Sequence, residues 1–314
     1  MYDLIGDIHG HADCLVNLLE KLGYKKSGDV YHHHSSRRVI FLGDFIDRGP
    51  KIREVLSIAK NMVDNGTALA VMGNHELNAM AYHTKDPANP GHFLRPHNDK
   101  NTAAHKATID QLGEDLNFYI DWFRTLPLWL DLPELRVVHG CWDNYCIQDV
   151  QKALPANRSI DTDFLIKSCI EKGEVFTQVE ILLKGKEIIL PDGITFFDKD
   201  GHLRKKARSR WYLDPNDQKY NTYRTYLWQT PEINCDDLLD LKIIKPLPYG
   251  KSEKPVFVGH YWLEDKAPSI LASNVACLDY SVAKDGFLCA YSHDGEQTLS
   301  NEKFCYPKPV CHNI

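Results

Sequence analysis

The chain has 314 residues, enough for one large α/β domain or two ordinary ones. Its 43% hydrophobic and 25% charged residues are typical of a globular protein, and its net charge of −6 argues against stable nucleic-acid binding, which needs a basic face. Nine cysteines without a CxxC pair, no apolar run long enough to span a membrane and no signal-peptide pattern together predict a reduced, cytoplasmic protein.

The first element expected is a strand over residues 1–5, followed by Gly6-Asp7-Ile8-His9-Gly10 and a helix over 11–22 with leucines at helical spacing. Asp7 and His9 are two residues apart, so they share a face of an extended chain. An Asp and a His that converge at a strand end form half of a metal site, although such pairs also occur by chance.

The second unit is the apolar strand 37–42, the loop Gly43-Asp44-Phe45-Ile46-Asp47-Arg48-Gly49-Pro50 and a helix over 51–65. Two carboxylates and a guanidinium therefore sit at the carboxyl end of a core strand, where α/β sheets bind ligands. Carboxylates are metal ligands, and Arg48 can bind a phosphate through two parallel hydrogen bonds. The alternative is a structural loop whose Arg forms an ion pair.

A third apolar run, over 67–72, ends in Gly73-Asn74-His75-Glu76. His75-Glu76 does not begin a zincin motif His-Glu-x-x-His, because position 79 is Ala. What remains is a neutral amide oxygen on Asn74 and an imidazole on His75 that is either a ligand or a proton donor. The order β-α-β-α-β predicts a parallel sheet with these loops on one edge.

Two segments between the clear elements are expected to be insertions. Residues 81–101 are rich in Pro, His and Asn, and with the helical pattern over 102–123 they predict a lid or insertion over 81–125. Residues 151–245 predict a second insertion or a substrate-side subdomain. It contains a basic run over 204–210 that is either a solvated face or a phosphate-binding surface.

Two further strands end in histidines, at His139-Gly140 and at Gly259-His260. Apolar runs over 270–272, 275–280 and 287–291 then predict an antiparallel meander. A β-α-β first half and a mostly β second half together predict an α/β fold, a two-sheet sandwich flanked by helices in one domain over 1–314.

The ordered series of strand-end motifs resembles the calcineurin-like metallophosphoesterases. It is most similar to the phosphoprotein phosphatase branch, whose signature is the Asp-Arg-Gly of residues 47–49. Within that branch it looks most like small bacterial phosphatases, including diadenosine-tetraphosphatase-like enzymes and RNA-repair phosphatase modules. The resemblance implies the α-β-β-α metallophosphoesterase fold.

The resemblance also implies two divalent metal ions that share one bridging carboxylate, Asp44. The first ion would be held by Asp7, His9 and Asp44, and the second by Asp44, Asn74, His139 and His260. Nitrogen and oxygen donors without cysteine favour Mn²⁺, with Fe or Zn²⁺ as alternatives. A hydroxide bridging the metals would attack phosphorus directly.

The same resemblance assigns catalytic and substrate-binding roles. His75 would protonate the leaving oxygen, Asp47 would orient His75, and Arg48 would bind phosphate with Asn74 beside it. Arg208, three residues before a Trp, matches a substrate-binding Arg of the bacterial relatives. The chain departs from eukaryotic protein phosphatases at Cys141, where they have a second glycine.

The function expected is therefore a metal-dependent phosphatase of the serine/threonine-protein-phosphatase type that acts on a phosphorylated substrate and not at a membrane. The first alternative is a dinucleoside polyphosphate hydrolase, and the second is a nucleic-acid end phosphatase or phosphodiesterase. A rival of another class is a non-catalytic α/β binding domain.

Overall fold

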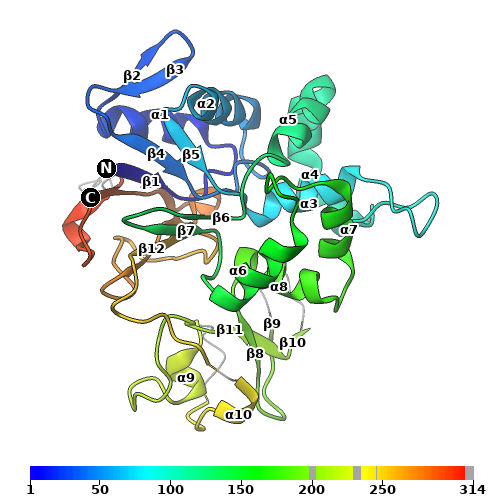
Figure 1. Cartoon of the computed structure of the whole chain (residues 1–314), viewed down its shortest axis with the longest axis vertical. Helices are drawn as coiled ribbons and strands as arrows, with labels where there is room; N and C mark the ends of the chain where they lie inside the picture. The colour runs from blue at the N-terminus through cyan, green and yellow to red at the C-terminus, as the bar shows by residue number, and fades with distance from the viewer. Residues whose placement is uncertain (198–202, 229–234, 245, 308–314) are drawn as a thin grey trace, which may run out of the picture.

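A computed structural model of the protein describes residues 1–197, 203–228, 235–244 and 246–307. Two β-sheets form its centre (Figure 1). The first sheet has the order β17-β16-β1-β4-β5, with β1 at Tyr2–Ile5, β4 at Arg38–Phe41, β5 at Ala68–Ala70, β16 at Ala290–His293 and β17 at Phe304–Cys305. The second has the order β13-β12-β7-β6, with β6 at Trp129–Asp131, β7 at Arg136–Val138, β12 at Val256–Val258 and β13 at Val275–Cys277.

Alternating side chains divide the core into the layers of a sandwich. Leu4 and Ile40 of the first sheet share one buried cluster with Val137 and Phe257 of the second. Their neighbours along the strands, such as Ile5, belong to the other large cluster, which contains the helix side chains. Because successive residues of a strand point to opposite faces, each sheet has one face toward the other sheet and one toward helices. The predicted two-sheet fold is confirmed.

The crossover helices are amphipathic, as their leucine and isoleucine spacing predicts. α1 (Ala12–Lys21) and α2 (Ile52–Asp64) connect the parallel strands β1, β4 and β5. α3 (Asn74–His83) follows β5. α6 (Asn144–Ala153) packs against α8 (Glu174–Lys184), and α7 (Thr162–Cys169) packs against α8 and α3 (Figure 1). A hairpin of β2 (Tyr24–Ser27) and β3 (Val30–His33) separates α1 from β4.

The predicted antiparallel meander over 270–291 is confirmed only between its last two runs. β13 pairs in parallel with β12, whereas β14 (Asp279–Tyr280) and β15 (Phe287–Leu288) form a separate antiparallel pair, joined through the short η2 helix (Val282–Lys284). β16 then crosses to the first sheet, antiparallel to β1. The chain changes direction at Ser281 and Asp285, which have the left-handed φ values of 57° and 62°. Runs of two to four apolar residues do not specify which sheet they join.

The expected helix over 102–123 is two helices, α4 (Asp99–Leu112) and α5 (Leu116–Phe123). The short η1 helix (Gly113–Asp115) separates them, because Gly113 has a φ of 51° that interrupts α4. The segment 84–98 before α4 has no helix and only an isolated bridge between Lys85 and Phe93. A lid function for 81–125 stays a prediction.

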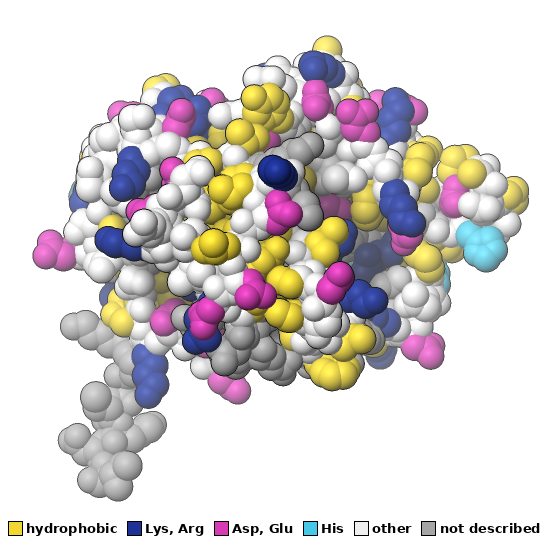
Figure 2. All heavy atoms as spheres, turned by 90° about the horizontal axis from the view of Figure 1, so that it is seen from below, with side chains coloured by type: hydrophobic (Ala, Val, Ile, Leu, Met, Phe, Trp, Pro, Cys, Tyr) yellow, Lys and Arg dark blue, Asp and Glu magenta, His cyan; other side chains and the backbone are white. Residues whose placement is uncertain are grey.

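Residues 187–244 contain a third, small buried cluster of their own. Its elements are β8 (Glu187–Ile189), β9 (Phe196–Phe197), β10 (Leu203–Arg204), β11 (Lys206–Arg208), α9 (Tyr223–Tyr226) and α10 (Leu241–Ile244). Figure 2 views the molecule from this end and shows hydrophobic side chains interspersed with charged ones. Large exposed apolar side chains of this part include Ile189, Phe197, Leu203 and Leu238. No helix among the described residues is long and apolar enough to cross a membrane.

Candidate active site

The loops that follow β1, β4, β5, β7 and β12 bring the six predicted metal ligands to one place. Asp44 lies in the middle, with its Oδ2 atom 3.3 Å from His139 Nε2 and 3.6 Å from His9 Nε2. The ligand-type atoms fall into two groups, each with all atoms within 4.8 Å of one another: His9, Asp44 and His75, and Asp44, His139 and His260. All six predicted ligands are buried, with exposures of 7% or less: Asp7, His9, Asp44, Asn74, His139 and His260.

Five of these six residues have a buried polar atom without a hydrogen-bond partner: Asp7 Oδ1, His9 Nε2, Asn74 Oδ1, His139 Nε2 and His260 Nε2. Unpaired buried polar atoms are rare in folded proteins, so five at one site indicate that the site holds another group. His9 Nδ1 lies 2.8 Å from the Ile46 carbonyl and His139 Nδ1 2.7 Å from the Leu42 carbonyl. Each Nδ1–H donates to that carbonyl, which leaves the Nε2 lone pair available. These donors fit divalent metal ions.

Buried Glu76 connects the loops that carry this cluster. Its carboxylate accepts hydrogen bonds from the backbone N–H groups of Asp44, Phe45 and Gly73, at 2.8 to 2.9 Å. Burial raises the pKa of Glu76 to about 7, and the Asp44 charge acts in the same direction. A Cβ atom at Gly73 would lie 2.1 Å from Asp44 Oδ1, so only glycine permits this approach of the two loops.

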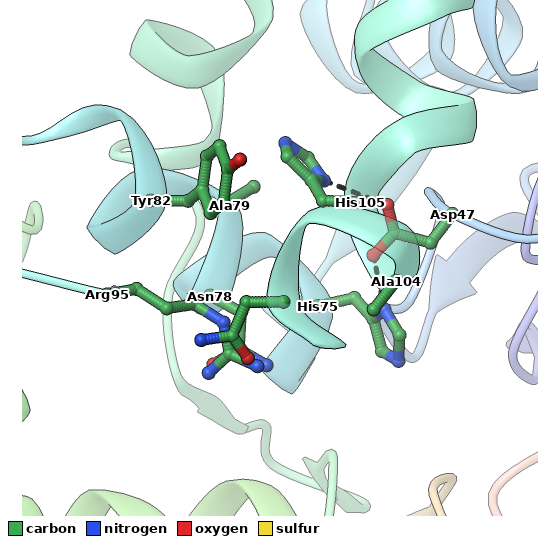
Figure 3. A pocket seen from close by; sticks show the side chains of 9 residues that line it. Asp47, His75, Asn78, Ala79, Tyr82, Arg95, Ala104 and His105 are labelled. Carbon is green, nitrogen blue, oxygen red and sulfur yellow. Dashed lines mark hydrogen bonds and ion pairs between the residues drawn. The ribbon is translucent and has the colours of Figure 1, made fainter. Parts of the chain in front are cut away.

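His75 is held by Asp47, which is in turn held by α4. His75 Nδ1 lies 2.5 Å from one oxygen of Asp47. The other oxygen accepts hydrogen bonds from His105 Nδ1 at 2.9 Å and from the Thr108 hydroxyl at 2.6 Å (Figure 3 shows the histidine contacts). Burial alone would raise the pKa of Asp47, but the hydrogen bonds from His105 and His75 outweigh it and hold that pKa below its ordinary value. The Asp47 carboxylate is therefore ionised, and hydrogen bonds from three side chains hold it in place.

Arg48 is exposed, and its guanidinium lies over an aromatic ring. Its guanidinium carbon is 3.9 Å from the centre of the Trp262 ring, and its Nη2 is 3.4 Å from His75 Nε2. The backbone N–H of Trp262 donates to the buried carboxylate of Asp279 at 2.8 Å. Trp262 thus supports the guanidinium through a cation–π contact, while the N–H groups of Arg48 remain able to bind a ligand.

The backbone of the site is strained. Among the described residues, ten non-glycine residues have positive φ, and seven of them lie in or beside this site: His9, Asp44, Asp47, Arg48, His260, Trp262 and Ser281. Side chains rarely adopt this conformation, and it clusters at functional sites because the surrounding structure enforces it.

The basic run over 204–210 divides into two kinds of residue. Lys205 and Lys206 are exposed, and Arg204 forms an ion pair with Glu187 at 3.1 Å, as expected of a solvated face. Arg208 is partly buried, and its Nε atom has no hydrogen-bond partner. Burial lowers the pKa of His260, and the charge of Arg208 lowers it further, so Arg208 lies close enough to act on the metal-ligand cluster. Its contact with phosphate stays a prediction.

Sequence reasoning did not identify His105, Thr108, Trp262 or Asp279 as parts of the site. His105 and Thr108 are three residues apart on one buried face of α4, which is the only sequence signal they give. Trp262 lies two residues after His260 and Asp279 lies beyond the next strand, and nothing local connects either of them with Arg48. Their roles depend on tertiary packing.

Comparison with known proteins agrees with this geometry. A family model described as calcineurin-like phosphoesterase matches residues 2–184, more than half of the chain. A symmetrical bis(5'-nucleosyl)-tetraphosphatase of Buchnera aphidicola is 26% identical over 310 residues, which cover 95% of this chain and 96% of that protein. An asymmetrical bis(5'-nucleosyl)-tetraphosphatase of Halalkalibacterium halodurans is 45% identical over 74 residues, which cover 24% of this chain and 30% of that protein.

The matches with the first five curated relatives span only 30% to 57% of the length of those proteins. A solved serine/threonine phosphatase of Saccharomyces cerevisiae aligns over 99% of this chain and 80% of that chain, at 13% identity and a TM-score of 0.48, too loose a likeness to bear on function. The family match covers the strands and loops that carry most of the site. The chain therefore belongs to the calcineurin-like phosphoesterases, a family of metal-dependent hydrolases.

Proposed function

We propose that this protein is a metal-dependent hydrolase that cleaves the phosphoanhydride chain of dinucleoside polyphosphates. The observation that carries the hydrolytic part is the set of five unpaired buried ligand atoms around Asp44, next to an exposed Arg48 and a His75 fixed by Asp47. The substrate class is supported by the names of the relatives, above all the one that aligns along nearly the whole chain.

The metal ligands in this proposal are Asp7, His9 and Asp44 for one ion, and Asp44, Asn74, His139 and His260 for the other. Their mixed nitrogen and oxygen donors favour Mn²⁺, Fe or Zn²⁺ over Ca²⁺ or Mg²⁺. When bound, the ions would supply Lewis-acid activation of water and of the reacting phosphate. His75 is not a ligand in this proposal, although its Nε2 lies 4.0 Å from Asp44 Oδ2 and it belongs to one of the two candidate ligand groups. The metal content of a His75→Asn variant tests this assignment.

Arg48 binds the reacting phosphate and neutralises its charge. It is exposed and its guanidinium is already held over the Trp262 ring, so it can donate two parallel hydrogen bonds with a smaller loss of side-chain entropy. Asn74 is the first residue of α3, and in this proposal its side-chain amide also binds the reacting phosphate. The transition state carries more charge on its equatorial oxygens, and Arg48 is directed toward that charge.

His75 donates a proton from Nε2 to the leaving oxygen. The Asp47 carboxylate fixes the proton on Nδ1, which orients the ring and stabilises its cationic form. Burial opposes the charge on His75, but the Asp44 and Asp47 carboxylates outweigh it and raise its pKa. In a phosphoanhydride, the leaving oxygen belongs to a second phosphate.

The protein-phosphatase prediction rests on the Asp47-Arg48-Gly49 signature and is less well supported than the dinucleoside polyphosphate alternative. The prediction of nucleic-acid end phosphatase activity has no specific support from the site. Both stay predictions, as do the cytoplasmic location and the identity of the metals.

The test is a substrate panel at fixed free Mn²⁺, with the chelated protein as control. The panel contains diadenosine tetraphosphate, a phosphoserine peptide and 5'- and 3'-phosphorylated oligonucleotides. We expect the highest kcat/KM for diadenosine tetraphosphate, and its products report the bond cleaved: two ADP for the central bond, ATP and AMP for an outer one. A higher kcat/KM for the peptide or an oligonucleotide would overturn the substrate assignment, and turnover that persists after metal removal would overturn the mechanism.

A further inference from the structure

A cavity of about 40 Å³ opens beside the His75–Asp47 pair (Figure 3). Its polar lining includes Asp47, His75, Asn78, Arg95 and Asn101, from the β4–α2 loop, α3, the segment 84–98 and α4. A cavity that holds one water needs about 10–15 Å³, so this one is large enough for the oxygens of a phosphate group. It lies on the His75 side of the site.

Arg95 brings a positive charge to this cavity that no carboxylate neutralises by contact. Its Nη1 donates to Asn78 Oδ1 at 2.9 Å. No carboxylate lies within 4.0 Å of its guanidinium in the part of the chain that the structure describes. The Asp47 carboxylate, which lines the cavity, is already hydrogen-bonded to His75, His105 and Thr108. A partly buried guanidinium with donors to spare is a binding site for an anion.

The segment that carries Arg95 is held in place by an aromatic stack. The Tyr82 and His97 rings stack at 3.8 Å, and the His97 and Phe93 rings at 4.0 Å. The Arg95 backbone N–H donates to the Ala81 carbonyl at 3.1 Å. The stack and this hydrogen bond attach residues 93–97 to the end of α3, so Arg95 is positioned before any ligand binds.

We propose that Arg95 binds the phosphate of the leaving group. The proposal rests on the proposed function, because it takes His75 as the donor to the leaving oxygen. The proposal places the rest of the leaving group in the cavity beside His75 that Arg95 lines. A nucleotide leaving group presents an anionic phosphate there, whereas the leaving group of phosphoserine or of p-nitrophenyl phosphate presents none. Arg95 therefore selects phosphoanhydrides over phosphate monoesters.

The experiment compares Arg95→Ala and Arg95→Gln with the wild-type holoenzyme on diadenosine tetraphosphate and on p-nitrophenyl phosphate. Gln retains a hydrogen-bonding side chain next to Asn78 and removes only the charge. We expect the ratio of the two kcat/KM values, anhydride over monoester, to fall roughly 10- to 100-fold, as for loss of a charged hydrogen bond. Lys85→Ala removes an exposed cation from the same segment and should leave this ratio within about twofold of the wild-type ratio.

A second readout separates this proposal from the proposed function. Pyrophosphate and inorganic phosphate are tested as inhibitors of p-nitrophenyl phosphate hydrolysis at fixed free metal. We expect the inhibition constant of pyrophosphate to rise at least tenfold more than that of phosphate in both Arg95 variants. Equal changes for both inhibitors, or none, would overturn the role of Arg95. Failure of the wild type to cleave diadenosine tetraphosphate would overturn only the proposed function, since the inhibitor comparison does not require that activity.

Discussion

Replacement of His75 by Asn separates proton donation from metal binding. Asn is close to His in reach and polarity but has no proton to give at neutral pH. His75 Nδ1 lies 2.5 Å from Asp47 Oδ2, the length of a short charged hydrogen bond, so the ring is held in one orientation with Nε2 toward the site. General acid catalysis contributes roughly 10²–10⁴-fold, or about 2.7–5.4 kcal/mol at 1.36 kcal/mol per tenfold. We therefore expect His75→Asn to lower kcat by roughly 10²–10⁴-fold on substrates with poor leaving groups.

The assay is a leaving-group series at fixed metal, from alkyl phosphates such as phosphoserine to nitrophenyl phosphates. An alkoxide needs the proton in order to leave, whereas nitrophenolate leaves as a stable anion, so the loss should shrink along the series. Asp47→Asn should show the same pattern more mildly, because it removes the group that orients His75. Metal content is measured on each variant by mass spectrometry. Equal losses across the series, or a missing equivalent of metal, would show that His75 is a ligand or a scaffold residue.

Four other substitutions address the rest of the site and the core. Asp44→Asn should lose metal and essentially all activity, because the Asp44 carboxylate belongs to both ligand groups. Two equivalents of metal bound to this variant would refute the bridging role. Arg48→Ala should retain metal and raise the inhibition constant of inorganic phosphate by roughly 10- to 100-fold, and an unchanged constant would count against phosphate binding. Thr108→Val should lower kcat by roughly 3- to 10-fold with unchanged metal content, because Asp47 loses two hydrogen bonds, one to its carboxylate and one from its backbone N–H. A normal kcat would show that Thr108 is not needed to position Asp47. Phe257→Ala, in the buried layer between the sheets, should lower the free energy of unfolding by about 3–5 kcal/mol, and a loss below 1 kcal/mol in denaturant titrations would contradict that burial.

The meeting of the candidate metal ligands was predictable because these residues lie at strand ends. Asp7 and His9 follow β1, Asp44 follows β4, and Asn74 follows β5. Parallel strands place their carboxyl ends on one edge, so the sequence order of these motifs already determines that they meet. The helices between them have clear apolar stripes, and their bounds are within two residues of the expected ones.

The support around Arg48 and Asp47 was not predictable in the same way. Trp262 follows β12 of the second sheet, whereas Arg48, which it contacts, follows β4 of the first sheet. The backbone N–H of Trp262 donates to Asp279, which lies beyond the next strand. His105 reaches Asp47 from a helix that was expected only as part of an insertion. Such contacts depend on how elements pack, and no periodicity within one element encodes them.

At the left-handed backbone positions of the site, the residue that activity requires is not the residue that would be most stable. Asp47 and Arg48 both have a φ of 67°, a conformation that costs about 1–3 kcal/mol in a non-glycine residue and almost nothing in glycine. Glycine at position 48 would relieve this strain and also remove the guanidinium. Selection for thermal tolerance alone would therefore favour inactive variants at this loop, whereas selection for turnover preserves its strain. Directed evolution of this protein should screen for both properties in every round.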